Sequence, residues 1–359
     1  MRDNVLGIKL GSNYSVGYGL GINPKYPKTI GPRVELTCVH KVPAHLLRKD
    51  VEWRFSRDAD RYDGSIYPLE YGLPRGGSPK EVAKSCMLLG HYVKWMLEGV
   101  DDETGIVFCL PMMKYKEGMD QLKTVLNKKA KGSIGKRYIM EAWAAALATV
   151  GVKESLSSQV ISMNFGSSTL EVCLYVGKKM IAQNVYPFGG WTIDREMQHA
   201  ISQANRGITV TPRQARMVKE QYNYKTGKSV DGEFTKDGRV VEVQVTKEVM
   251  NPILEWFTKN VANNIASQFL PVAAQNSQKA VTAIQTEGMG YLCICGGMSN
   301  MPGFADLMGK QLIEARALNP KLEVKYPTDP DGVAAPAYGA YMLADMFEEQ
   351  REEKKAKTW

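Results

Sequence analysis

One short pattern occurs twice in the chain: a polar residue, an apolar residue, Gly, Ser and a polar residue. The copies are residues 9–13 (KLGSN) and 164–168 (NFGSS), and 164 minus 9 gives a spacing of 155 residues. An apolar segment precedes each copy and a second extended segment follows it, so each copy predicts the turn of a β-hairpin. Two such hairpins, one near the start of each half, predict a duplicated, two-lobed protein.

Turns of this composition are suited to binding phosphate. Successive backbone N–H groups can converge on an anion because glycine and serine have small side chains that do not obstruct its approach. The serine hydroxyl groups add hydrogen-bond donors. We therefore expect both turns to contact a polyphosphate held between the two lobes. The expected contacts are Gly11, Ser12, Asn13 and Tyr14 in the first turn, and Gly166, Ser167, Ser168 and Thr169 in the second.

A third segment, residues 291–304 (YLCICGGMSNMPGF), has the pattern of a strand, a turn and a helix. Its first five residues form an apolar run of strand length. Gly296 and Gly297 then permit backbone angles closed to other residues and let a ligand approach the main chain. Taken alone, a Gly-Gly pair after a strand indicates a simple turn equally well. The two hairpins elsewhere in the chain favour a nucleotide-facing turn.

Five segments together resemble the nucleotide-site motifs of the actin-like ATPase superfamily, and they occur in the family order. They are the two hairpins, the helix YIMEAWAAALATVG around Glu141, FGGWTIDREM at 188–197 and CGGMSNMPGFADLM at 295–308. Residues 337–345 (AYGAYMLAD) look like the second interdomain helix. Within the superfamily, YPLEYGLP (67–74) and VKEQYNY (218–224) look most like prokaryotic filament-forming actins of the cell-shape and magnetosome-aligning kind.

The resemblance implies an α/β chain with a two-lobed actin-like fold, made of duplicated ribonuclease-H-like domains with a small inserted subdomain in each lobe. The alternation of helix with apolar strand also favours α/β lobes. The expected limits are residues 1–157 for lobe I, with its subdomain at about 23–75, and 158–325 for lobe II, with its subdomain at about 207–247. Residues 326–359 are expected to return to lobe I.

The resemblance also implies ATP or ADP as the ligand, with Mg²⁺ held through phosphates and water. It adds to the expected nucleotide contacts Lys9, Asn164, Gly189, Gly190, Lys219, Glu220, Gly296, Gly297 and Met298. Glu141 matches the family's catalytic acid or amide, which implies that it orients or deprotonates the attacking water.

Simpler interpretations of Glu141, Lys219 and Glu220 stay open. A Glu in the first turn of a helix is favoured by the helix dipole alone, which would explain Glu141. Lys219 and Glu220 equally fit an ordinary exposed ion pair. Asp194, in the first turn of a predicted helix, needs no role beyond stabilising that helix.

The chain departs from the family at two positions. In actin-like ATPases each phosphate hairpin usually carries an Asp, two residues before its first Gly, that orders the waters around Mg²⁺. Here these positions are Lys9 and Asn164. Mg²⁺ is typically held by one or two carboxylates plus substrate phosphates, so we expect weak or altered metal coordination and slow hydrolysis. Lys9 would instead place a positive charge beside the phosphates, unless its side chain turns away from the site.

The leading interpretation is a nucleotide-binding cytoskeletal protein of the cytoplasm that polymerises into homopolymeric filaments, with ATP hydrolysis coupled to assembly. Membrane or organelle adaptor proteins are possible further partners. A catalytically inactive filament scaffold is one alternative, favoured by Lys9 and Asn164. A small-molecule kinase of the same superfold is another, although no distinct Asp is evident to act as base toward a substrate hydroxyl.

Composition agrees with this interpretation. A chain of 359 residues is ample for two cores, and no apolar run reaches the length of a membrane span. Residues 1–4 lack the apolar region of a signal peptide, and the six cysteines are expected to be reduced, which indicates the cytosol. The net charge is +8, but positive residues are dispersed and the tail at 348–357 mixes signs, so no nucleic-acid partner is expected.

Overall fold

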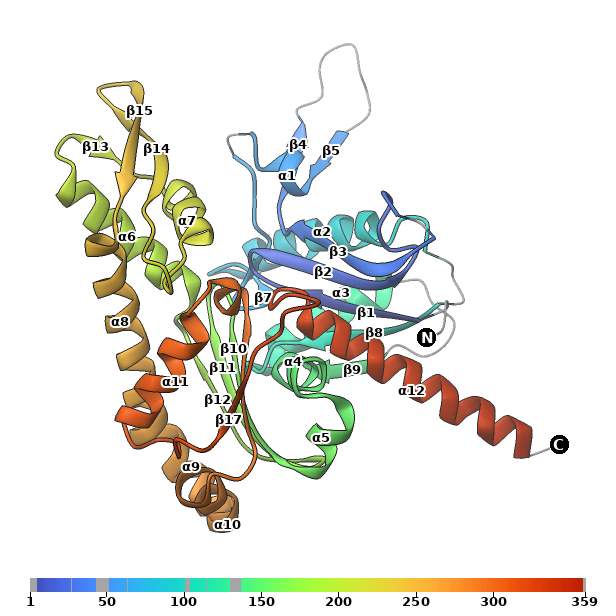
Figure 1. Cartoon of the computed structure of the whole chain (residues 1–359). Coiled ribbons are helices and arrows are strands. Elements are labelled where there is room, and N and C mark those ends of the chain that lie inside the picture. The colour runs from blue at the N-terminus through green and yellow to red at the C-terminus, as the bar shows by residue number, and fades with distance from the viewer. Residues whose placement is uncertain are drawn as a thin grey trace. The chain divides into compact units, whose positions relative to one another are not determined.

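Figure 1 shows a computed structural model of the chain. It describes residues 5–26, 28–42, 52–62, 64–100, 104–113, 115–129 and 137–357, with the side chains of 347–357 left out. Residues 1–4, on which the expectation about a signal peptide depends, and residues 43–51 of the expected first subdomain lie outside the described residues. The chain divides into two compact units, unit 1 being Met1–Ala148 with Val333–Trp359, and unit 2 being Thr149–Gly332.

The two units contain five-stranded sheets of the same topology. The strand order is β3-β2-β1-β8-β9 in unit 1 and β12-β11-β10-β16-β17 in unit 2. In each sheet the first three strands are antiparallel neighbours, and the last two join them in parallel. This shared topology confirms the predicted α/β class and the predicted duplication.

The strands have these bounds. Those of unit 1 are β1 (Val5–Leu10), β2 (Tyr14–Leu20), β3 (Ile30–Leu36), β8 (Gly105–Leu110) and β9 (Arg137–Met140). Those of unit 2 are β10 (Gln159–Phe165), β11 (Leu170–Val176), β12 (Lys179–Tyr186), β16 (Tyr291–Gly296) and β17 (Glu323–Lys325). Both predicted hairpins are therefore present, as β1–β2 and β10–β11.

Unit 1 packs helices against both faces of its sheet, because side chains alternate between the faces of a strand. Leu6, Ile8 and Leu10 of β1 share a core with α2 (Pro79–Met96) and α3 (Lys116–Lys129). Gly7, on the other face, lies against Ala337 of α12 (Ala335–Lys357). Lys9 follows Gly7 by two positions and so shares its face, away from the α2–α3 core.

A small group of short elements lies beside the unit 1 sheet, and its first strands lie above α2 in Figure 1. These are β4 (Val39–Val42), β5 (Glu52–Phe55), α1 (Ser56–Ala59), β6 (Leu69–Glu70) and β7 (Leu73–Pro74). Aromatic side chains connect them to α2: Trp53 stacks on His91 and Phe55 stacks on Trp95, with ring centroids 4.5 and 5.1 Å apart.

Helix α2 has a capped start. Ser78 is its N-cap, Pro79 is the first helical residue, and the Ser78 side chain accepts from the Glu81 N–H. The Glu81 carboxylate in turn accepts from the Gly77 N–H and the Ser78 hydroxyl.

Unit 2 has the larger core. Helices α6 (Gly190–Ala204) and α11 (Phe304–Glu314) both contact α8 (Lys247–Asn264), which continues as a π-helical turn, η1 (Ile265–Phe269). Four apolar side chains at four-residue intervals along α8 and η1 lie in this core: Phe257, Val261, Ile265 and Phe269. Shorter elements complete the unit: α5 (Val152–Ser157), α9 (Leu270–Asn276), α10 (Gln278–Thr282), η2 (Ala283–Glu287) and η3 (Gly297–Asn300).

A second small group projects from unit 2 beside α6 (Figure 1). It contains α7 (Pro212–Gln221), β13 (Ile208–Thr209), β14 (Val230–Lys236) and β15 (Arg239–Val245). Asp237 and Gly238 form the turn between β14 and β15, and both have positive φ. This is the backbone geometry that a tight hairpin favours.

Within the ranges that the structure describes, no helix is both long enough and apolar enough to cross a membrane.

Helix α12 can approach α4 (Glu141–Val150) closely only because residue 339 is glycine. A Cβ at Gly339 would overlap the carbonyl oxygen of Ala144. We expect Gly339→Ala to lower the free energy of unfolding by about 1–3 kcal/mol, because overpacking forces backbone to shift. Urea denaturation would measure this. Gly31→Ala is the matched control, since a Cβ there meets nothing within 4 Å; equal midpoints for the two variants would contradict the close approach.

Candidate functional site

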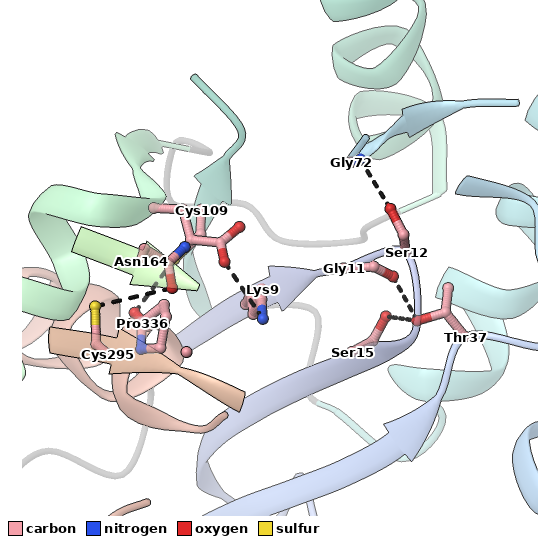
Figure 2. A network of polar contacts seen from close by, with 12 residues as sticks. Lys9, Gly11, Ser12, Ser15, Thr37, Gly72, Cys109, Asn164, Cys295 and Pro336 are labelled. Atoms are coloured by element: carbon pink, nitrogen blue, oxygen red, sulfur yellow. Dashed lines mark hydrogen bonds and ion pairs between the residues drawn. The ribbon is translucent and has the colours of Figure 1, made fainter. Parts of the chain in front are cut away.

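The first Gly-Ser turn, between β1 and β2, is held in place by its own backbone and by Thr37. The Gly11 N–H donates to the Tyr14 carbonyl across the turn (3.1 Å). The Thr37 hydroxyl donates to the Gly11 carbonyl (2.7 Å) and lies 2.8 Å from the Ser15 hydroxyl, while the Thr37 N–H donates to the Asn13 carbonyl (2.8 Å). Figure 2 shows the side-chain part of this network. These bonds orient the turn through its carbonyl groups.

Ser12 connects the same turn to the segment between β6 and β7. Its hydroxyl oxygen accepts from the Gly72 N–H at 3.0 Å (Figure 2). Gly72 has a positive φ of 73°, and a Cβ there would lie 2.8 Å from the Pro111 ring, so glycine is required at this contact. Ser12 and Asn13 are buried in this structure, and Gly11 and Tyr14 are half-buried.

The second turn, between β10 and β11, repeats the backbone geometry of the first. The Gly166 N–H donates to the Thr169 carbonyl at 2.9 Å, as the Gly11 N–H does to the Tyr14 carbonyl. Both bonds join residues that occupy the same places in the repeated pattern. The duplication seen in the sequence thus extends to the hydrogen bond that closes each turn.

The start of helix α6 supports the second turn. The Gly190 N–H donates to the Gly166 carbonyl (2.9 Å) and the Trp191 N–H donates to the Ser167 carbonyl (2.7 Å). A Cβ at Gly189 would come within 2.5 Å of the Gly166 carbonyl oxygen and within 3.0 Å of the Ser167 carbonyl oxygen. The Gly-Gly pair is therefore needed for a helix to meet the turn backbone to backbone. The nucleotide contact expected for Gly189 and Gly190 stays a prediction.

Lys219 forms a buried ion pair. Its ammonium lies 2.7 Å from an Asp194 carboxylate oxygen and donates to the Gly190 carbonyl at 3.0 Å. Burial raises the pKa of Asp194, and Lys219 partly opposes that rise. The exposed ion pair considered for Lys219 and Glu220 is wrong for Lys219, which is buried, while Glu220 is exposed. Asp194 is also more than a helix-dipole residue, because it is the counterion of Lys219.

Lys9 and Glu141 form a second buried ion pair, within unit 1. The Lys9 ammonium lies 3.3 Å from a Glu141 carboxylate oxygen, and both residues are less than a tenth exposed. Glu141 is the first residue of α4, because Tyr138 to Met140 belong to β9 and not to the helix predicted for them. Lys9 therefore faces the candidate catalytic carboxylate, and a solvated first-turn Glu does not describe Glu141.

Asn164 occupies in the second hairpin the place of Lys9 in the first. Its side-chain oxygen accepts from the Cys295 thiol at 3.8 Å, as Figure 2 shows. Asn164 pairs in register with Glu171 on β11, so the two side chains share one face of the sheet. Glu171 is buried, and it was not among the residues expected at the site. The four-residue turn sets the register of the hairpin. The sequence alone could therefore have placed Glu171 opposite Asn164.

The Gly296–Met298 turn is built from close backbone packing. Gly296 has a φ of 86°, and a Cβ there would overlap the Phe165 carbonyl. The Ser299 hydroxyl donates to the Gly296 carbonyl (2.8 Å), and the Gly296 N–H donates to the Gly332 carbonyl (3.1 Å). The Met298 side chain lies in the unit 2 core, so a nucleotide contact at this residue would come from its main chain.

The residues present do not fit a magnesium site of the family's kind at the first turn. The position expected to carry a carboxylate holds an ammonium group, and the nearby Glu141 carboxylate is paired with that ammonium. Asn164 offers an amide at the corresponding position of the second turn. Among the described side chains, no group of three or more His, Cys, Asp or Glu is arranged to hold a metal ion.

Two sheets of identical topology, each with a closed Gly-Ser turn on its first hairpin, define an actin-like fold of two lobes. Three solved structures resemble nearly the whole chain. The "MamK double helical filament" has a TM-score of 0.71 and 18% identity, covering 95% of this chain and 98% of that one. MreB5 of Spiroplasma citri has TM-scores of 0.70 bound to AMPPNP and 0.69 bound to ADP, with 13% and 14% identity. These two alignments cover 98% and 97% of this chain, and 98% of each MreB5 chain.

The Salactin family model matches residues 4–348, and the chain belongs to the Salactin family. No curated protein matches the sequence. The similar structures confirm the predicted actin-like fold.

Removal of the Lys219 ammonium tests the buried pair of unit 2. Lys219→Met leaves the Asp194 carboxylate buried without its counterion, which should cost about 3–5 kcal/mol of unfolding free energy at neutral pH. The pKa of Asp194 should rise further, so the folded chain holds a proton that the unfolded chain releases. The loss should therefore be smallest below the ordinary carboxyl pKa and grow as pH rises. Urea titrations at about pH 4 and about pH 8 would measure it.

Two further variants control this experiment. Lys310→Met removes one partner of an exposed pair with Glu314 (3.7 Å) and should change stability by less than about 1 kcal/mol. Asp194→Asn combined with Lys219→Met should recover stability at the higher pH. A loss for Lys219→Met that stays the same at both pH values would contradict the assignment.

Proposed function

We propose that this chain is a nucleotide-binding, actin-like cytoskeletal protein that polymerises into filaments in the cytoplasm. The observation that carries the proposal is the pair of Gly-Ser turns, which have the same closing hydrogen bond in two sheets of identical topology. Two independent turns of one geometry indicate a shared ligand. Backbone N–H groups and serine hydroxyls in such turns favour the phosphates of ATP or ADP.

The similar structures support the choice of ligand and of assembly. The MreB5 structures are described as bound to AMPPNP and to ADP, and one MamK structure is a double helical filament. Another MamK structure is that of a non-polymerising mutant bound to AMPPNP. In that protein, nucleotide binding is thus possible without assembly. For the present chain, binding and polymerisation should accordingly be measured separately.

In this proposal the first turn binds phosphate through Gly11, Ser12 and Asn13, and the second through Gly166, Ser167 and Ser168. Gly296, Gly297 and the Met298 main chain would contact the base and ribose. Lys219 and Glu220, at the end of α7, would lie near the adenosine, with Lys219 oriented by Asp194. Adaptor proteins at a membrane or organelle would be further partners of a filament.

Hydrolysis would depend on Glu141. A buried carboxylate can orient or deprotonate an attacking water, and this role needs the oxygen that does not face Lys9. The Lys9 ammonium engages one side of the carboxylate and leaves less of it free to accept a proton from water, so we propose slow hydrolysis. An inactive filament scaffold is the second candidate function, and the observation that favours it is the same Lys9–Glu141 pair.

Sedimentation of the purified full chain tests assembly. We expect more protein in the pellet with ATP than without nucleotide, and filaments by negative-stain microscopy in the same samples. Phosphate release is measured in the same tubes. An ATPase releases phosphate, and an inactive scaffold does not. Absence of filaments under every nucleotide and salt condition would reject the cytoskeletal proposal. Phosphate transfer that requires a small hydroxyl-containing substrate would indicate a kinase instead.

Restoration of carboxylates tests whether the altered turns slow hydrolysis. Lys9→Asp together with Asn164→Asp should raise phosphate release in Mg²⁺, by about ten-fold or more if the two groups together contribute at least 1.4 kcal/mol to the transition state. Lys84→Met, an exposed change on α2, is the control for loss of a positive charge. No gain from the double variant would contradict the explanation.

A further inference from the structure

The side chain of Lys9 points along the first Gly-Ser turn. A Cβ built at Gly11 would lie 3.3 Å from Lys9 Cε and 3.4 Å from Lys9 Nζ. The ammonium is therefore beside the glycine whose N–H closes the turn, and a Glu141 carboxylate oxygen lies 3.3 Å from the ammonium. The alternative weighed from the sequence, a Lys9 side chain turned away from the turn, does not describe this arrangement.

The surroundings of Lys9 keep its charge in place. Lys9 is 6% exposed and lies on the face of β1 opposite the α2–α3 core. A buried ammonium is costly unless an opposite charge compensates it, and Glu141 supplies that charge. In the low dielectric of such a site the ammonium attracts an anion more strongly than an exposed lysine would.

The hairpin register adds a second observation. On the first hairpin the residue opposite Lys9 is Val16, so Lys9 is the charged member of that cross-strand pair. On the second hairpin the corresponding residues are Asn164 and Glu171. A positive group thus stands at the first turn, where a divalent cation would otherwise need carboxylate ligands.

We propose that Lys9 takes the place of the divalent cation at this site, so that the chain binds nucleoside di- and triphosphates without Mg²⁺. This inference rests on the proposed nucleotide-binding function and specifies its charge balance. Glu141 holds the ammonium at the turn before nucleotide binds, and the phosphates then share the ammonium with Glu141. Glu141 consequently competes with the nucleotide for Lys9.

Two variants follow from this arrangement. Lys9→Met removes the charge and should weaken nucleotide binding in EDTA by about ten-fold or more, as expected for loss of a hydrogen bond between charged groups. Glu141→Gln leaves the ammonium without its competitor and should tighten binding in EDTA, while phosphate release falls. A merely structural Glu141 would not produce opposite changes in affinity and turnover.

The closing experiment measures the Kd of the full chain for ATP and ADP by isothermal titration calorimetry, in EDTA and in excess MgCl₂. The wild type should bind in both buffers with Kd values that agree within a few-fold. Lys9→Asp places a carboxylate beside Glu141, so it should bind nucleotide well only with Mg²⁺. Mg²⁺ alone should also raise the thermal midpoint of Lys9→Asp and leave that of the wild type unchanged.

Folding and surface charge are controlled within the same series. The double variant Lys9→Met with Glu141→Gln removes both charges of the pair and leaves no buried carboxylate without its counterion. If Lys9→Met alone folds poorly, the loss of nucleotide affinity can be measured on this double variant. Lys84→Met removes an exposed lysine of the same unit and should leave the Kd unchanged.

The outcomes separate this inference from the proposed function. Binding by the wild type that is lost in EDTA would overturn the inference, would leave the nucleotide-binding proposal standing, and would direct attention to Glu171 as a carboxylate near the metal. Wild-type binding in EDTA that Lys9→Met does not weaken would also overturn it. No binding in either buffer would reject the proposed function and the inference together.

Discussion

Close approach of backbone to backbone is the constraint on which both halves of this molecule depend. Each Gly-Ser turn is closed by one N–H to carbonyl bond, and its other carbonyls are bound by a neighbouring element, Thr37 in unit 1 and the start of α6 in unit 2. Such contacts require glycine where a Cβ would collide, as at Gly189 and Gly296. The turns are thereby preorganised, which limits the entropy that a ligand must remove on binding.

Two buried ion pairs lie next to these turns. Lys9–Glu141 stands beside the first turn, and Lys219–Asp194 reaches the Gly190 carbonyl behind the second. Buried pairs of this kind contribute little net stability, although loss of one partner is strongly destabilising. Their effect here is to fix the positions of a charged group and of a helix. One pair holds a positive charge at the candidate phosphate site, and the other orients the helix that supports the second turn.

Local patterns were sufficient to predict much of the fold. The two Gly-Ser hairpins, the strand at Tyr291 and the helix from Phe304 all follow from residues close in the chain, where turn chemistry and side-chain period act directly. The same logic predicted a helix across Tyr138 to Met140, which is strand β9 instead. That strand is paired with β8, and a parallel partner far along the chain is invisible to local periodicity.

By itself, the sequence determined the duplicated α/β architecture, the two turns and the departures at Lys9 and Asn164, because repeats and glycine positions are local properties. Only the tertiary structure decided which charges meet. Lys9 and Glu141, like Lys219 and Asp194, come from separate elements, and a charge finds its counterion through strand pairing and helix packing. Glu171 shows the intermediate case: its carboxylate shares a face with Asn164 because the turn length sets the register.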